Sequence, residues 1–104
     1  MNAVLILTTV GADFDVRPLA RDLVESRLAA CVNILPPVSS IYQWQGAVHE
    51  ESEQLLMIKT TAERVDQLQA ALFARHPYEV PELVVVNADR VSDAYGRWLA
   101  DAVR

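Results

Sequence analysis

Short continuous apolar runs alternate with stretches of helical apolar spacing along this chain. Residues 4–9 are β-branched or apolar, which is typical of a buried strand. Apolar side chains then recur every three or four residues over 16–28, which predicts an amphipathic helix. Asp13 or Asp15 can cap its start, and Pro18 would lie in its first turn, where no intrahelical hydrogen bond is lost.

A second strand at residues 31–35 is followed by two consecutive prolines, which belong at the edge or at a bulge of a sheet. Extended sequence resumes over 39–45, and Gly46 begins a turn. A return strand from about 50 to 60 then ends in an apolar run. The pattern predicts a long hairpin with a polar tip and an apolar base.

Thr60 stands three residues before Glu63, which is the spacing of a capping box at the start of a helix. Apolar residues at helical spacing over 65–72 supply the inner stripe of that helix. Residues 76–81 contain two prolines, each of which disfavours helix in the residue before it. We therefore expect a loop there, after the second helix.

The last elements are a strand at residues 83–86 and a helix that begins near Ser92 or Asp93. The order is β-α-β-β-α-β with an extra C-terminal helix, which matches the ferredoxin-like split βαβ plan of the α+β class. At 104 residues the chain is long enough for one domain, 1–104, and too short for two.

Three of the four predicted strands are continuously apolar, which indicates that both faces of the sheet are covered. In this topology the two main helices cover one face, and the C-terminal helix is too short to cover the other. A bare second face would exceed the few hundred Å² of contiguous apolar surface that monomers tolerate. The sequence therefore predicts a homo-oligomer without fixing the number of copies.

Composition narrows the class of protein. Hydrophobic residues make up 52% of the chain, which excludes disorder. The net charge of −5 and the scattered basic residues argue against nucleic acid as a partner. No apolar stretch approaches the ~20 residues that span a membrane. One cysteine and a start without a basic signal region predict a cytoplasmic protein.

Catalytic motifs are scarce. The sequence has no nucleophile elbow, no H-E-x-x-H and no glycine-rich phosphate loop. We therefore expect a protein that is not an enzyme, with an acid–base pair assembled between subunits as the open alternative.

Three side chains are candidates for metal or thiol chemistry. His76 is the best single metal ligand, although a structural histidine at a helix C-terminus, near the surface, is the commoner arrangement. His49 lies at the hairpin tip beside Glu50 and Glu51, where a weak cation site competes with an ordinary polar turn. Cys31 is expected to be a small buried hydrophobe.

Five further residues are candidates for a cleft between subunits. Tyr42 and Trp44 share one face of the hairpin, where they line a cleft or anchor an interface. Lys59, Tyr78 and Glu82 supply a cation, a hydroxyl and an acid that could converge on a small anionic ligand. A structural ion pair between Lys59 and Glu82 is the equal alternative.

Four blocks of the sequence, in order along nearly the whole chain, resemble the CutA divalent-cation-tolerance proteins. They include an S-x-Y-x-W-x-G hairpin strand and an H-P-Y-x-x-P-E loop. The blocks are residues 27–34 (RLAACVNI), 40–46 (SIYQWQG), 53–61 (EQLLMIKTT) and 76–83 (HPYEVPEL).

The resemblance implies a ferredoxin-like subunit, an interlocked trimer and a cytoplasmic role in metal tolerance, chiefly to copper. It also implies an architecture related to the PII signalling trimers, and no enzymatic activity. Copper ligands proposed in the family fall here on Thr8 and Arg75, which have replaced a cysteine and a histidine, and on His76.

Two main hypotheses follow. In the first, the protein is a trimeric metal-binding or metal-responsive protein, with copper or another divalent metal at His76 as its ligand. In the alternative, it is a PII-like small-molecule sensor or a protein-interaction scaffold without direct metal binding. A purely architectural trimer is a third possibility.

Overall fold

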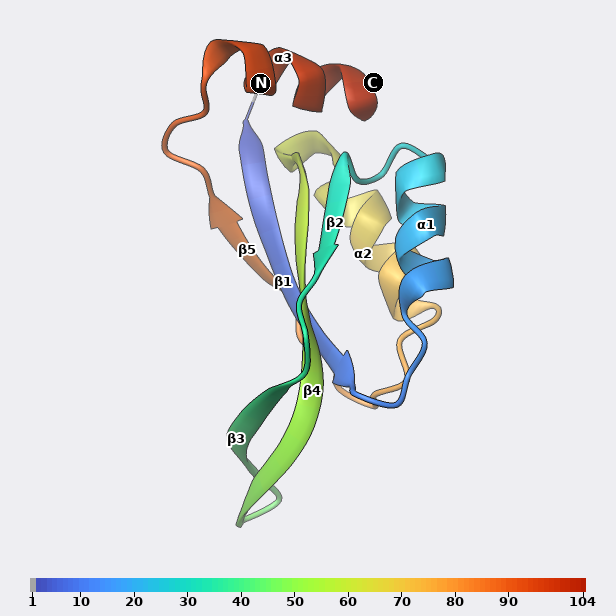
Figure 1. Cartoon of the computed structure of the whole chain (residues 1–104), viewed down its shortest axis with the longest axis vertical. Helices are drawn as coiled ribbons and strands as arrows, with labels where there is room; N and C mark the ends of the chain where they lie inside the picture. The colour runs from blue at the N-terminus through green and yellow to red at the C-terminus, as the bar shows by residue number, and fades with distance from the viewer. Residues whose placement is uncertain (1) are drawn as a thin grey trace.

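A twisted antiparallel sheet forms the centre of the computed structural model, which describes residues 2–104 (Figure 1). Two helices pack on one side of this sheet, a third crosses one end, and a hairpin extends beyond the other end. In chain order the elements are β1 (Ala3–Gly11), α1 (Arg17–Glu25), β2 (Cys31–Ile34), β3 (Val38–Trp44), β4 (Ala47–Thr61), the 3₁₀ turn η1 (Ala62–Arg64), α2 (Val65–Phe73), β5 (Val84–Asn87) and α3 (Asp93–Ala102).

The strand order is β2-β4-β1-β5, and β3 pairs with the outer half of β4. Leaving out the β3 hairpin extension, this is the split βαβ arrangement, so the ferredoxin-like fold is confirmed, with α3 as the extra helix. The break between β2 and β3 falls at Pro36 and Pro37, as the prolines predict. The hairpin turns tightly at Gln45 and Gly46, which both have positive φ.

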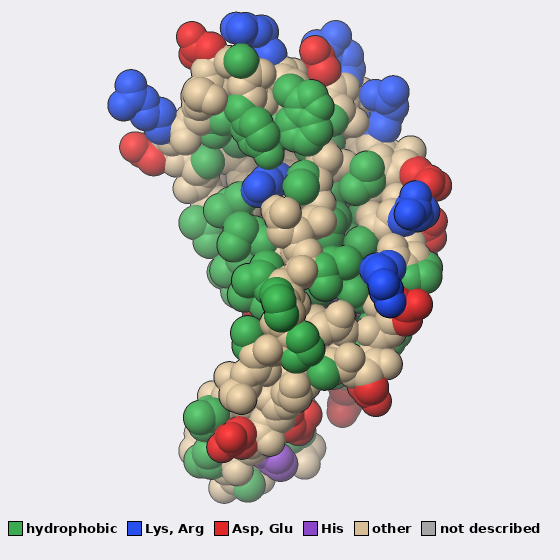
Figure 2. Space-filling model, viewed as in Figure 1, with side chains coloured by type: hydrophobic (Ala, Val, Ile, Leu, Met, Phe, Trp, Pro, Cys, Tyr) green, Lys and Arg blue, Asp and Glu red, His purple; other side chains and the backbone are tan. Residues whose placement is uncertain are grey.

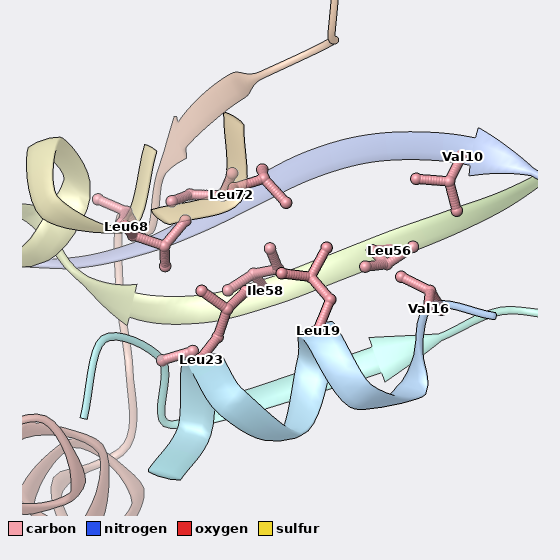
Figure 3. Close-up of a cluster of buried hydrophobic side chains, with 11 residues drawn as sticks. Val10, Val16, Leu19, Leu23, Leu56, Ile58, Leu68 and Leu72 are labelled. Atoms are coloured by element: carbon pink, nitrogen blue, oxygen red, sulfur yellow. The ribbon is translucent and has the colours of Figure 1, made fainter. Parts of the chain in front are cut away.

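One face of the sheet is fully covered by α1 and α2. Alternate residues of the central strands point to this side, and their side chains are almost completely buried. The apolar runs that looked continuous in sequence are therefore alternating in burial. Figure 3 shows the cluster, which includes Val10, Leu56 and Ile58 from the strands, Val16, Leu19 and Leu23 from the first helical region, and Leu68 and Leu72 from α2.

The opposite face is covered only at one end. There Leu99 and Val103, from α3 and its end, pack with Ala3 and Ala30 in a small second cluster. Farther along, Val84 and Val86 of β5, which pair with Leu7 and Leu5 on this face, are 48% and 43% exposed. Figure 2 shows hydrophobic side chains gathered between the C-terminal helix and the hairpin. The expectation that one chain leaves much of this face uncovered is confirmed.

Two predicted helix caps were wrong. The first helix begins at Arg17 after Val16, so neither Asp13 nor Asp15 is its N-cap, although Oδ1 of Asp15 accepts a 3.4 Å hydrogen bond from the backbone N–H of Arg17. The second was to be capped by Thr60, which instead lies in β4. Its hydroxyl donates a 2.7 Å hydrogen bond to the carbonyl of Leu28 and is therefore not available to a helix start.

Two further expectations concern residues at the starts of α3 and β2. Ser92 precedes the first residue of α3, as predicted. Cys31 is partly exposed and not buried, because it opens β2, an edge strand with a neighbour on one side only. No helix within residues 2–104 is long and apolar enough to cross a membrane.

Candidate functional site

An open cleft of about 790 Å³ lies where the hairpin meets the loop that follows α2. Its floor includes Thr9 near the end of β1, its sides come from β3 and β4, and the loop of residues 77–82 closes it. The lining residues are Thr9, Ser40, Ile41, Tyr42, Trp44, His49, Glu51, Glu53, Pro77, Tyr78, Glu79, Val80 and Glu82.

The cleft is acidic and aromatic. Four of its lining side chains are carboxylates and three are Tyr or Trp, whereas none of the lining residues within 2–104 is Lys or Arg. The structure thus brings together four of the five residues that the sequence proposed for a cleft: Tyr42, Trp44, Tyr78 and Glu82.

Lys59, the fifth residue, lies elsewhere in the chain. Its ammonium group is 6.0 Å from the centre of the Tyr95 ring, on the side of the sheet that α3 covers in part. Among residues 2–104 it forms no ion pair with Glu82. Convergence of Lys59 with the cleft of another subunit stays a prediction.

Tyr78 and Glu53 form the most protected polar contact of the cleft. The Tyr78 hydroxyl donates a 2.6 Å hydrogen bond to Oε2 of Glu53, which is only 6% exposed. Burial, with help from this carboxylate, raises the pKa of Tyr78 far above its usual value. The phenol therefore stays protonated and serves as a donor.

Tyr42 and Glu51 form the equivalent contact nearer the hairpin tip, but in an exposed position. The Tyr42 hydroxyl donates to Oε1 of Glu51 at 2.7 Å, and the Tyr42 ring stacks on His49 at 5.6 Å between centroids. The hydrogen bond to Glu51 also raises the pKa of Tyr42. Glu50 is on the opposite face of the strand from His49 and Glu51, so the three do not form one cluster.

Glu82 lies on the loop side of the cleft and is partly buried. Burial raises the pKa of its carboxyl group, and the neighbouring charge of Glu53 raises it further. Both causes disfavour the ionised form of Glu82 beside the charge of Glu53. A bound cation would relieve the same electrostatic cost.

His76 is buried, so the expectation of a surface position was wrong. β5 pairs with β1 only as far as Leu7, and beyond that point His76 contacts β1 at Thr9. Its Nε2 donates to the carbonyl of Thr9 at 2.9 Å, and its Nδ1 accepts from the backbone N–H of Tyr78 at 3.1 Å. Both partners require the neutral ring with its proton on Nε2. Burial lowers the pKa of His76, in agreement with that form.

The family's copper positions are only partly brought together here. The hydroxyl oxygen of Thr8 lies 3.4 Å from Nε2 of His76, so these two positions are neighbours. Arg75 is turned away and pairs with Asp22 of α1. Within residues 2–104, no three His, Cys, Asp or Glu side chains are placed to hold a metal ion.

Sequence reasoning missed Glu53 and Glu79 as cleft residues. The strand alternation contained a signal for Glu53, because residues 49, 51 and 53 share the hairpin face that Tyr42 occupies. Glu79 lies in an irregular loop, where spacing along the chain predicts no direction.

Comparisons with known proteins agree on one family. The sequence model of the CutA1 divalent ion tolerance protein matches residues 4–102. The divalent-cation tolerance protein CutA of Thermus thermophilus is 44% identical over 97 residues, which are 93% of this chain and 94% of that protein.

Solved structures give the same result. CutA from Synechococcus elongatus has a TM-score of 0.92 and 43% identity, over 99% of this chain and 91% of that one. A structure described as the PII-like protein CutA from Nostoc has a TM-score of 0.88 and 34% identity, over 100% and 98% of the two chains. On this sequence match and this fold, the chain belongs to the CutA1 divalent ion tolerance family.

Proposed function

We propose that this protein acts in the tolerance of divalent metal ions, chiefly copper, as a cytoplasmic homotrimer without enzymatic activity. The observation that carries the proposal is the cleft, which gathers four carboxylates and has no basic residue in its lining. Such a site attracts cations and repels anions. The family to which the chain belongs supports the link to divalent ions.

Assembly is part of the proposal for two reasons. The valines of β5 and the hairpin side chains Ile41 and Val48 leave apolar surface exposed that copies of the chain would bury. A metal site also needs more donors than one chain supplies, since no three ligand side chains converge within residues 2–104. Carboxylates from adjacent subunits would complete the set.

His76 is the imidazole ligand that the proposal tests. A metal bound at Nε2 would move the ring proton to Nδ1, which now accepts a hydrogen bond from the N–H of Tyr78. The hydrogen bond from Nε2 to Thr9 would be lost as well. Copper at His76 therefore competes with two contacts that hold the loop, whereas copper at Glu53 and Glu82 leaves these two in place and competes with the hydrogen bond from Tyr78 to Glu53.

The test is a titration of tag-free protein with Cu(II), Cu(I) and Zn(II) at neutral pH, with His76→Ala and Glu82→Gln measured alongside. Glu25→Gln is the matched control, because Glu25 is an exposed carboxylate at the end of α1. We expect saturable binding that Glu82→Gln weakens at least fivefold and Glu25→Gln leaves unchanged. A further loss in His76→Ala would make the imidazole a ligand. No saturable binding, or equal binding by all variants, would refute direct metal binding.

A PII-like sensor without direct metal binding is the second candidate function. The cleft volume of about 790 Å³ supports it, because sites for small organic molecules span roughly 300–1,000 Å³. The likeness to the PII-like CutA of Nostoc also supports it. Thermal stabilisation by an organic ligand with none by metals would favour this function.

A further inference from the structure

The charge of the cleft limits the class of small molecule that it can take. Glu51, Glu53, Glu79 and Glu82 are among its lining residues, and Lys59, the basic residue that sequence reasoning had placed there, lies against Tyr95 instead. An anionic metabolite would enter a field of its own sign. The electrostatics of a single chain therefore favour a cation.

The aromatic side chains add a second and independent feature. Tyr42 and Trp44 are 37% and 40% exposed in the single chain, although aromatic rings are normally buried more completely. Both belong to the lining of the cleft, as does Tyr78. Ring faces that remain accessible attract ammonium and guanidinium groups and also pack against flat apolar bodies.

The dimensions separate an organic cation from a bare metal ion. A metal ion needs several donor atoms within about 2–2.6 Å, and no three ligand side chains converge in this way within residues 2–104. The carboxylates line a cleft of about 790 Å³ whose lining also includes Ile41, Trp44 and Val80. This volume and this mixed lining fit a molecule of drug-like size with a positive group at one end.

We propose that the cleft binds an organic cation: a small amine or guanidinium compound with a flat apolar body. The positive group lies beside Glu53 and Glu82, and the body packs on Trp44 and Tyr42. The inference concerns the same cleft as the proposed function but requires no metal. It names an organic ligand, which a role in metal tolerance does not by itself predict.

Three probes with one indole body and different charges test the proposal. Tryptamine is positive at pH 7.5, tryptophol is neutral and indole-3-acetate is negative. Calorimetric titration of the native assembly should give a Kd for tryptamine at least tenfold lower than for tryptophol, with indole-3-acetate weakest. Equal affinities, a preference for the anion, or no binding because another copy fills the cleft would each overturn the proposal.

Variants locate the bound probe. Glu82→Gln should raise the Kd for tryptamine at least fivefold while leaving tryptophol nearly unchanged, whereas Trp44→Leu should weaken both. Glu25→Gln, outside the cleft, should change neither. Insensitivity of tryptamine to both cleft variants would place it elsewhere and refute the site.

Copper titrations of the same samples keep the two proposals apart. Tryptamine binding without copper binding leaves this inference standing and removes direct metal binding. Copper binding without tryptamine binding does the reverse.

Discussion

The two faces of the central sheet use the same strands in opposite ways. On the side of α1 and α2, Ile6 and Ile58 are fully buried, and the hydroxyls of Thr8 and Thr60 make hydrogen bonds inside the chain. On the other side, Val86 is 43% exposed, and the exposed carboxylates of Glu51 and Glu79 line an open cleft. The first face is covered by helices of the same chain, whereas the second leaves apolar and acidic side chains accessible to a ligand or another subunit.

The largest expected effect is on the covered face. Ile58→Ala removes a side chain with no exposed surface from the middle of the core, which costs about 2–5 kcal/mol of unfolding free energy. Chemical denaturation at several protein concentrations measures this loss. A loss below about 1 kcal/mol would show that this face tolerates cavities and would break the contrast between the faces.

A charge on the open face of the sheet should disrupt the assembly of subunits. Val86→Asp places a charge on the open face of β5, where Val86 pairs with Leu5 and is 43% exposed, and we expect the mass from light scattering to fall to that of one chain. Val24→Asp is the matched control, because Val24 on α1 is similarly exposed, at 39%, but lies on the helical side. Dissociation by both variants, or by neither, would contradict an interface on the open face.

A third measurement compares two similar hydrogen bonds in the cleft. Tyr78→Phe removes the donor to Glu53, a buried carboxylate, and should cost about 1–3 kcal/mol of unfolding free energy. Tyr42→Phe removes the donor to Glu51 in an exposed pair and should have little effect. Equal losses in the two variants would mean that burial does not distinguish them.

The smallest effect is the pH dependence of His76. Burial lowers its pKa in the folded state below the usual 6.5, so the unfolded chain binds the extra proton more readily. Its contribution to stability is complete above about pH 6.5 and is lost as the pH falls below that value.

The raised pKa of Glu82 acts in the opposite direction: its contribution is lost as the pH rises above its usual 4.5. Thermal melts of metal-free wild type and His76→Gln between pH 7.5 and 5.5 isolate the histidine. The wild type should lose more stability than the variant over this range. A larger loss in His76→Gln would reverse the assignment.

The sequence predicted the fold because the signals for it are local. Apolar runs, helical spacing and the prolines at 36 and 37 each act over a few residues, and they place the strands and helices within a few positions. The caps were less predictable, since the Thr60 hydroxyl is claimed by Leu28, a residue far away in sequence.

The cleft was predictable only in part, because sequence patterns reveal local arrangement and not contacts between distant residues. Tyr42 and Trp44 share a face by strand alternation, which sequence shows directly. The position of Lys59 beside Tyr95, and the use of both His76 nitrogens, depend on contacts between residues distant in sequence. No spacing rule contains those contacts.

Strand β4 also has a mechanical consequence. It is one uninterrupted strand of 15 residues, and its length at roughly 3.3 Å per residue is comparable to the molecule's longest dimension of 44 Å. Glu51 and Glu53 in the cleft and Ile58 in the core therefore belong to one continuous strand, with no loop or break between them. A displacement of the hairpin by a ligand or a neighbouring subunit is therefore transmitted along β4 to the centre of the sheet, where β4 pairs with β1.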